Sequence, residues 1–168
     1  MTHLPRSLFL LLGGLAAALA GSACNTHSSA FPKDFKPVIV QFNLETPRAD
    51  ASTATPLPLS GQRIPYDPTP VLTEGDIIGV KILPTQMGSC AVFSLTADAS
   101  RQFYLTSGAH QGLRLVVTIN GVPTGVFKIN EAIETGTLPV YLEMSDADLP
   151  DVVKGMNATC VELQKRLR

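Results

Sequence analysis

The sequence predicts an α+β domain of two layers, in which a mostly antiparallel or mixed sheet carries two helices on one face. Several segments alternate apolar and polar residues with a period of two, which is typical of half-buried strands. Two other segments repeat apolar residues at helical spacing. Because each element has one apolar side that must be buried against another layer, both helices are expected to cover the same face of the sheet.

The first strand is the clearest, because Val38, Val40, Phe42 and Leu44 all fall on one face of the segment from residue 38 to 45. The Asn120-Gly121 pair indicates a tight hairpin, since both residues tolerate positive φ. Strands linked by such turns pair with their neighbours, which favours antiparallel pairing. The further strands are expected at 76–83, 90–95, 113–120, 126–133 and 138–144.

Two helices are expected. Thr96 is a good N-cap for a helix that runs to about Ala109. Asp148 can cap a second helix, with Pro150 in its first turn, where proline is tolerated. The second helix places its apolar residues on one stripe, and Gly155 within it suggests close packing. The stripe consists of Leu149, Val152, Val153, Met156, Cys160, Leu163 and Leu167.

The segment 46–70 is rich in proline, with six of the 13 prolines of the chain. Proline has no N–H for a sheet ladder and fixes φ, so this segment is expected to be an extended loop or edge structure. One strand before it cannot stand alone, so residues 38–168 are expected to form a single domain.

The amino terminus has the three parts of a secretory signal peptide over residues 1–23. A short region with Arg6 precedes an apolar stretch from Ser7 to Ala20, which is shorter than the about 20 residues of a membrane-spanning helix. Small residues follow. We expect the chain to be exported.

Cys24 follows this leader, and Gly21-Ser22-Ala23-Cys24 resembles the lipobox of bacterial lipoproteins except for Gly21, where the family has leucine. We expect lipidation of Cys24, with residues 24–37 as a tether to the membrane. Cleavage after Ala20 is the alternative. Asn25, which is not aspartate, favours the outer membrane by the rule that this resemblance implies.

The three cysteines support this assignment, because an odd thiol is a liability in an oxidising compartment. Lipidation of Cys24 leaves Cys90 and Cys160 as an even pair. The two thiols could form a disulfide, or they could both be small buried apolar side chains. The sequence leaves the two alternatives open.

From about Val71 to Met144 the chain resembles the head part of the first periplasmic domain of SecD, the accessory subunit of the bacterial Sec translocase. The resemblance rests on strand and turn patterns, and it implies this fold and a surface that handles polypeptides. The transmembrane helices of SecD have no counterpart here, and its Asp-Gly hairpin is Asn-Gly. The matching segments are Pro70 to Ile77, Val92 to Thr96 followed by a helix with Phe103 and Thr106, Gly112 to Val122, and then Ile129, Ile133 and Gly136.

Several chemistries have no support in the sequence. The net charge is −1 and no block of basic residues occurs, so nucleic acid is not expected as a partner. No spacing of His, Cys and Asp fits a metal, no nucleotide-binding motif occurs, and no cofactor is expected. Ser107 lies three residues before His110, and we interpret the pair as an accident of a helix end.

Two hypotheses on function follow. In the first, the chain is a non-catalytic envelope lipoprotein that is anchored in the membrane by its lipid. Its domain then binds another envelope protein or a polypeptide segment, for example at an exposed sheet edge. In the second, a cleft near His110 and the proline-rich loop binds a small ligand or a substrate. A pocket beside His110 is the feature that would keep the second hypothesis open.

Overall fold

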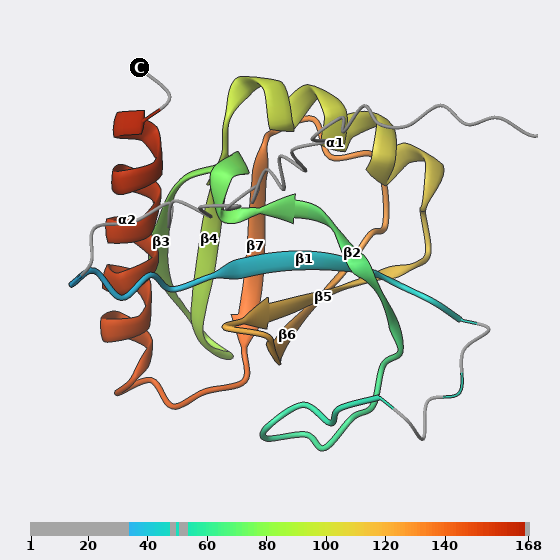
Figure 1. Cartoon of the computed structure of the whole chain (residues 1–168). Coiled ribbons are helices and arrows are strands. Elements are labelled where there is room, and N and C mark those ends of the chain that lie inside the picture. Colours follow the sequence, from blue (N-terminus) through green and yellow to red (C-terminus); the bar gives the residue numbers. More distant parts are fainter. Residues whose placement is uncertain (1–33, 48–49, 51–53, 167–168) are drawn as a thin grey trace, which may run out of the picture.

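The computed structural model describes residues 34–47, 50 and 54–166 (Figure 1). The predicted signal peptide, Cys24 and most of the predicted tether therefore lie outside the described residues. The described part has seven strands, two α-helices and one turn of 3-10 helix. In chain order these are β1 (Val40–Glu45), β2 (Tyr66–Thr73), η2 (Glu74–Asp76), β3 (Ile77–Thr85), β4 (Gly88–Leu95), α1 (Ala97–Ala109), β5 (Arg114–Ile119), β6 (Val122–Lys128), β7 (Thr137–Leu142) and α2 (Leu149–Arg166).

The strands form one sheet in the order β2-β1-β5-β6-β7-β4-β3, and every neighbouring pair is antiparallel. The predicted α+β fold is confirmed. The pairing is uneven, because β6 and β7 share only the pairs Gly125↔Leu142 and Val126↔Tyr141. On either side of this junction, β3, β4 and β7 cross the direction of β1, β2 and β5 (Figure 1). The sheet thus consists of two halves that meet at a short seam.

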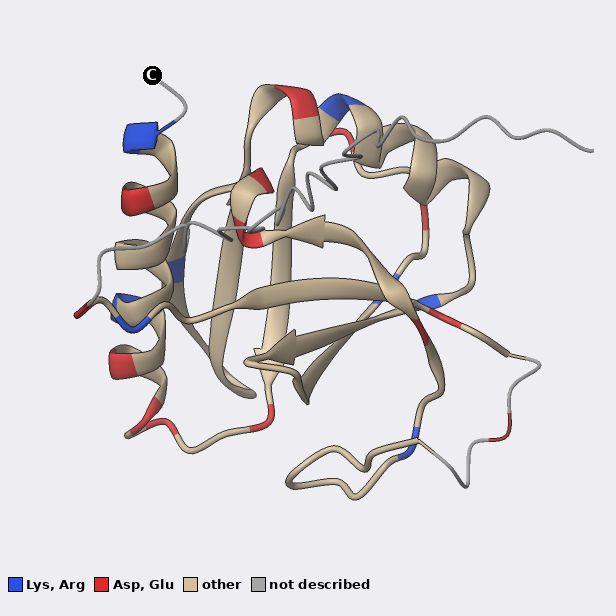
Figure 2. Cartoon of the chain, viewed as in Figure 1, with Lys and Arg blue, Asp and Glu red and all other residues tan. Residues whose placement is uncertain are grey.

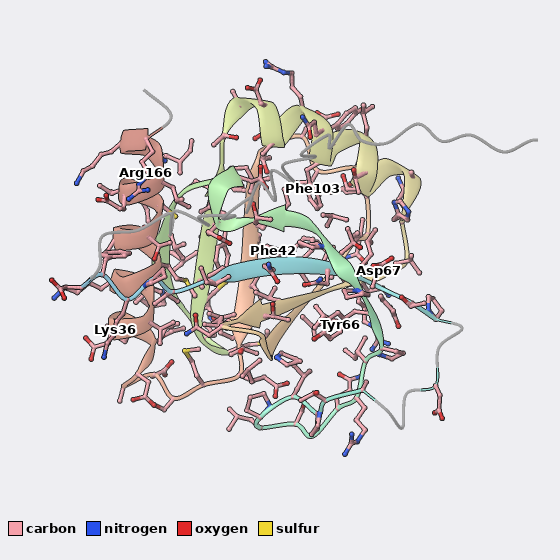
Figure 3. All side chains as sticks on the ribbon, viewed as in Figure 1. Lys36, Phe42, Tyr66, Asp67, Phe103 and Arg166 are labelled. Atoms are coloured by element: carbon pink, nitrogen blue, oxygen red, sulfur yellow. The ribbon has the colours of Figure 1, made fainter. Side chains whose placement is uncertain are left out.

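Both helices pack their apolar residues into the same core as the concave face of the sheet. Ala99 and Phe103 contribute from α1, and Leu149, Val153 and Met156 from α2. In the middle of the core, the ring of Phe42 on β1 meets the ring of Phe93 on β4 edge-on, with 5.1 Å between the centroids. Phe42 lies on β1, and Phe103 lies beneath α1 (Figure 3).

Gly155 has the close contact that its place in a helix suggested. A Cβ atom there would lie 2.6 Å from Cγ2 of Val38, so no larger residue fits. Thr159, one turn further along α2, accepts a hydrogen bond from the N–H of Val38 at 2.9 Å. The start of the first strand segment is therefore fixed against α2.

Two expected boundaries differ from the structure. The predicted strand at 126–133 is wrong in its limits, because β6 begins directly after the Asn120-Gly121 turn and ends at Lys128. Both turn residues have positive φ, as the hairpin requires. Pro123 hid this strand, since a proline argues against a central strand. β6 admits it beside a bulge at Thr124, because the consecutive β5 residues Val117 and Thr118 pair with Gly125 and Pro123.

The proline-rich segment contains both of the structures expected of it. Its end is β2, an edge strand that includes Pro68 and Pro70. Its earlier part is a loop that covers the other face of the sheet, where Leu57 and Ile64 pack on Val116. This is why all of β5 from Leu115 to Ile119 is buried, rather than every second residue.

Glu143 holds the tip of this loop. Its carboxylate accepts hydrogen bonds from the N–H groups of Leu59 and Ser60, each at 2.9 Å, and from the Ser60 hydroxyl at 2.6 Å. Burial of Glu143 raises its pKa, but these hydrogen bonds outweigh that effect, and the pKa is lowered. The loop is thus attached to the end of β7, in the other half of the sheet.

Side chains close both outer edges of the sheet. At the β3 edge, the amide of Asn157 on α2 bonds to both the N–H and the C=O of Val80, at 2.7 and 2.9 Å. At the β2 edge, Asp76 accepts from the N–H of Thr73 at 2.8 Å, and Asp67 accepts from the N–H of Thr69 at 2.8 Å. Pro68 and Pro70 have no N–H to offer. An extended segment therefore finds Val80 already occupied at the β3 edge and two N–H groups missing at the β2 edge.

Phe93→Ala is expected to lower the free energy of unfolding by about 3–5 kcal/mol, the usual cost of emptying a buried phenylalanine site. The reason is that Phe93 is fully buried and joins the two halves of the sheet through Phe42. Urea unfolding followed by circular dichroism measures the change. Met87→Ala is the matched control, because Met87 is 80% exposed and its loss should stay within about 0.5 kcal/mol. A loss below about 1 kcal/mol for Phe93→Ala would contradict this account of the core.

Candidate functional site

A hollow lies where β6 and β7 diverge. We call it the β6–β7 slot. Its volume is about 570 Å³, which is within the range of about 300–1,000 Å³ that is usual for ligand pockets. Phe127 at the end of β6 and Pro139 on β7 line its sides, and the connecting segment lines the rest. The full lining is Phe127, Glu131, Ala132, Ile133, Glu134, Thr135, Thr137 and Pro139.

Backbone groups of both strands turn towards this slot. Gly136 gives its C=O to β4, where it accepts from the N–H of Leu95 at 2.9 Å. Because successive residues of a strand turn their backbone groups to opposite sides, Thr137 and Pro139 turn theirs towards β6. On β6, Thr124 gives its C=O to β7, so Lys128 also turns its N–H and C=O that way. Within the described residues, β6–β7 pairing ends before these positions are reached.

A second hollow of about 420 Å³ adjoins the slot and shares Glu134 with it. We call it the α1 hollow. It lies along the outer side of α1, between Tyr104, Leu105 and the connecting segment. Leu105 is 71% exposed and Tyr104 is 41% exposed, so two large apolar side chains face solvent here. The remaining lining residues are Ser100 and Arg101.

The segment between the two hollows is held firmly. The N–H of Ile133 donates to Oγ of Ser107 on α1 at 2.9 Å, and that hydroxyl donates to the C=O of Tyr104. Gly136 has a φ of 63°, and a Cβ there would collide with Ser100. The walls of the slot are therefore set by α1, so the opening between β6 and β7 is built into the fold.

His110 lies in a third hollow, of about 340 Å³, at the end of α1. Its Nδ1 lies 2.8 Å from the C=O of Thr106, an acceptor, so Nδ1 carries the proton and Nε2 is the free ring nitrogen. Ser107 cannot serve as a nucleophile for this histidine, since its hydroxyl is fully buried and bonded on both sides. The other lining residues are Leu44, Glu45, Thr46, Pro47, Asp67 and Leu113.

One of the two carboxylates in this third hollow, that of Glu45, is already engaged. Glu45 accepts from Nε of Arg114 at 2.9 Å, from its backbone N–H at 3.0 Å, and also from Nη2. These hydrogen bonds, reinforced by the charge of Arg114, lower the pKa of Glu45 despite burial. Tyr66 and Asp67 lie beside each other near this end of β1 (Figure 3). The hollow beside His110 thus offers Nε2 of the imidazole and the exposed carboxylate of Asp67 as its main polar groups.

Neither a metal centre nor a membrane span is present among the described residues. No group of three or more His, Cys, Asp or Glu side chains is placed to hold a metal ion in that part of the chain. No helix in the same part is long and apolar enough to cross a membrane. Charged residues are found mainly on the helices and connections, while most of the strand surface is uncharged (Figure 2).

Cys90 and Cys160 are both unpaired and buried in this structure. Cys160 belongs to the main core and bonds weakly to the C=O of Glu74. Cys90 precedes Ala91, which does belong to that core, so the Cys90 side chain points to the opposite face of β4. Burial raises the pKa of Cys90, and it raises the pKa of Cys160 to about 11.

Comparison with solved structures gives a match over most of the domain. A structure of a membrane component, SecDF, that enhances protein export matches with a TM-score of 0.55, at 16% identity over 73% of this chain. A crystal structure of SecDF in a super-membrane-facing form matches with a TM-score of 0.55, at 15% identity over 72% of this chain. The chain has a SecD-type fold. No protein-family model and no curated protein matches the sequence.

The SecD-type fold extends beyond the segment in which the sequence suggested it. Residues 71–144 are less than half of the chain, whereas the structural match covers 73%. The chain spans 63% of the first matched structure and 19% of the full SecDF chain. The sequence did not indicate the slot, because the seam depends on how few residues of β6 and β7 pair. One feature of the sequence did point to the adjoining α1 hollow. Tyr104 and Leu105 are large apolar residues that do not lie on the face of α1 that Phe103 buries in the core.

Mass spectrometry without reductant is expected to find two free thiols on a Cys24→Ala variant, which isolates Cys90 and Cys160. In the folded protein, iodoacetamide should react slowly with both, because they are buried and a thiol with a raised pKa forms little thiolate. Both should react quickly in denaturant. A mass lower by two hydrogens than that of the reduced sample would instead establish a disulfide.

Proposed function

We propose that this chain is a non-catalytic SecD-like domain of the cell envelope that binds an extended polypeptide segment and acts in protein export. The β6–β7 slot supports this most directly, because apolar side chains form part of its lining and because Lys128 and Pro139 lie beyond the last β6–β7 pair. SecDF itself is a membrane component that enhances protein export, and the similarity of fold carries this process to the present chain as part of the proposal.

The mode of binding follows from which backbone groups are free. Polypeptides that add to a sheet gain affinity from main-chain hydrogen bonds and specificity from alternate side chains. The outer edges are poorly suited, since Asn157 occupies Val80 at one and prolines interrupt the other. In the slot, Lys128 offers both backbone groups and Pro139 offers a C=O. We therefore assign binding to the slot rather than to an outer edge.

Placement at the membrane is the second part of the proposal. Lipidation of Cys24 holds the domain at the envelope, facing the periplasm, with the outer membrane as the expected site. Cys24 lies outside the described residues, so the support comes from the leader, the lipobox-like Gly21 to Cys24 and the cysteine count. The described domain begins near Val38, whose N–H is bonded to α2.

The hollow beside His110 supports the alternative, a small-ligand or enzymatic site. His110 is half-buried, and a pocket does lie next to it. This candidate is the weaker one, because Glu45 is taken up by Arg114 and Ser107 is locked in the core. A ligand there would meet the free Nε2 of His110, the carboxylate of Asp67 and otherwise mainly apolar walls.

A short peptide of alternating Val and Thr is expected to shift the amide signals of Lys128 and of residues 131–137 in NMR titrations of the purified protein. Thr135→Trp should weaken this binding by about tenfold, or about 1.4 kcal/mol, because the indole fills the slot. The Thr135 side chain lies at the surface, so the fold should tolerate the change.

Gln86→Trp, at the exposed tip of the β3–β4 hairpin, is the matched control and should leave the affinity unchanged. Shifts confined to residues around His110 would favour the alternative function. Shifts confined to β2 or β3 would place binding at an outer edge and contradict the slot.

Cys24→Ala is expected to move most of the protein from the membrane fraction to the soluble fraction of the cell envelope, because the variant has no residue to carry the lipid. Cell fractionation followed by immunoblotting measures the distribution. Ser28→Ala, in the same segment, is the control and should remain with the membrane. If Cys24→Ala also stays there, the lipid is not the anchor and the surface of the domain makes the contact.

A further inference from the structure

Two carboxylates stand at the rim of the β6–β7 slot. Glu131 and Glu134 both line the slot, and Glu134 also lines the α1 hollow. Both side chains are exposed, and neither forms an ion pair within the described part of the chain. The segment that carries them is fixed by Ser107, so their positions relative to the slot are set by the fold.

The nearby cations do not neutralise this rim. Arg101, which lines the α1 hollow, is paired with Asp98 one turn earlier on the same helix. Lys128 lies at the end of β6, and no ion pair joins it to either glutamate among the described residues. Apolar side chains lie near the two carboxylates, since Tyr104 and Leu105 share the α1 hollow with Glu134 and Ile133 shares the slot.

We propose that the slot selects polypeptide segments in which apolar residues alternate with Lys or Arg. This inference rests on the proposed function and names the class of segment that it takes. An extended segment places successive side chains on opposite sides, so one set can contact Phe127 and Ile133, which both pack against the main core, while the other reaches the carboxylates. Opposite charge at a rim gives specificity and faster association more than affinity.

The backbone of the slot fits the same kind of segment. Pro139 has no backbone N–H, so only its C=O can form a hydrogen bond with a bound segment. The ammonium and guanidinium groups of Lys and Arg are donors only, and they can bond both to such carbonyls and to Glu131 or Glu134. An acidic segment would bring acceptors to a surface that is already rich in acceptors.

The test uses three short peptides of the same alternating Val/Thr pattern, in which two Thr positions are replaced by Lys and Arg, by two Gln, or by two Glu. The purified protein is titrated with each peptide and followed by NMR. The cationic peptide is expected to bind more tightly than the neutral one by about two- to fivefold for each carboxylate, the range for exposed ion pairs. This advantage should shrink between about 0.03 and about 0.3 M salt, because exposed charges are then screened.

The double variant Glu131→Gln/Glu134→Gln should remove the preference for the cationic peptide while leaving the neutral peptide's affinity unchanged. Asp146→Asn is the matched control, because Asp146 is an exposed acid in the connection before α2, away from the lining of both hollows. Unchanged amide signals in β3 and β4 verify that each variant is folded.

The outcomes separate this inference from the proposed function. Equal binding of the cationic and neutral peptides, or a preference that survives in the double variant, overturns the selectivity while polypeptide binding stands. If none of the three peptides binds in the slot, the proposed function itself fails, and this inference with it. Tighter binding of the acidic peptide overturns the assignment of the partner's charge.

Discussion

The contact between Phe42 and Phe93 is the interaction on which the arrangement of this domain depends. The two rings come from β1 and β4, which belong to opposite halves of the sheet, and both are fully buried. The seam between the halves has only two residue pairs, so backbone pairing alone cannot set their relative position. The core must do so. The aromatic contact, with the helices packed around it, lets β6 and β7 diverge without loss of the fold.

An antiparallel sheet that is not a closed barrel has two outer edges, and this one closes both of them locally. A side-chain amide from α2 bonds to Val80 in the way that a further strand would, and two aspartates with two prolines obstruct the other edge. Such measures prevent edge-to-edge association of folded chains. These measures act at single positions of each edge, and the interior seam is a further place in the described sheet where strand backbone extends beyond its pairing.

The sequence was sufficient for the fold class, most strands and both helices, because each of these depends on local periodicity or capping. Thr96, for example, caps α1 as its position suggested, with its hydroxyl accepting from the N–H of Ala99. Pro123 concealed the start of β6, since the bulge at Thr124 that lies beside it depends on the pairing with β5 and has no local signal. The slot was not predictable, because it arises from residues that fail to pair, and Glu131 and Glu134 meet it only through the way that α1 holds their segment.

The position of the slot determines how a bound segment would affect the two halves of the sheet. A segment that bonds to Lys128 on one side and to Pro139 on the other contacts both halves of the sheet where they are least connected. Hydrogen bonds on both sides would oppose further separation of β6 and β7, since they extend the ladder beyond Val126↔Tyr141. A segment in the α1 hollow alone contacts only α1 and the connecting segment, and has no such effect. Glu134 lines both hollows, so a basic side chain held there leaves the segment's neighbouring residues within reach of the slot.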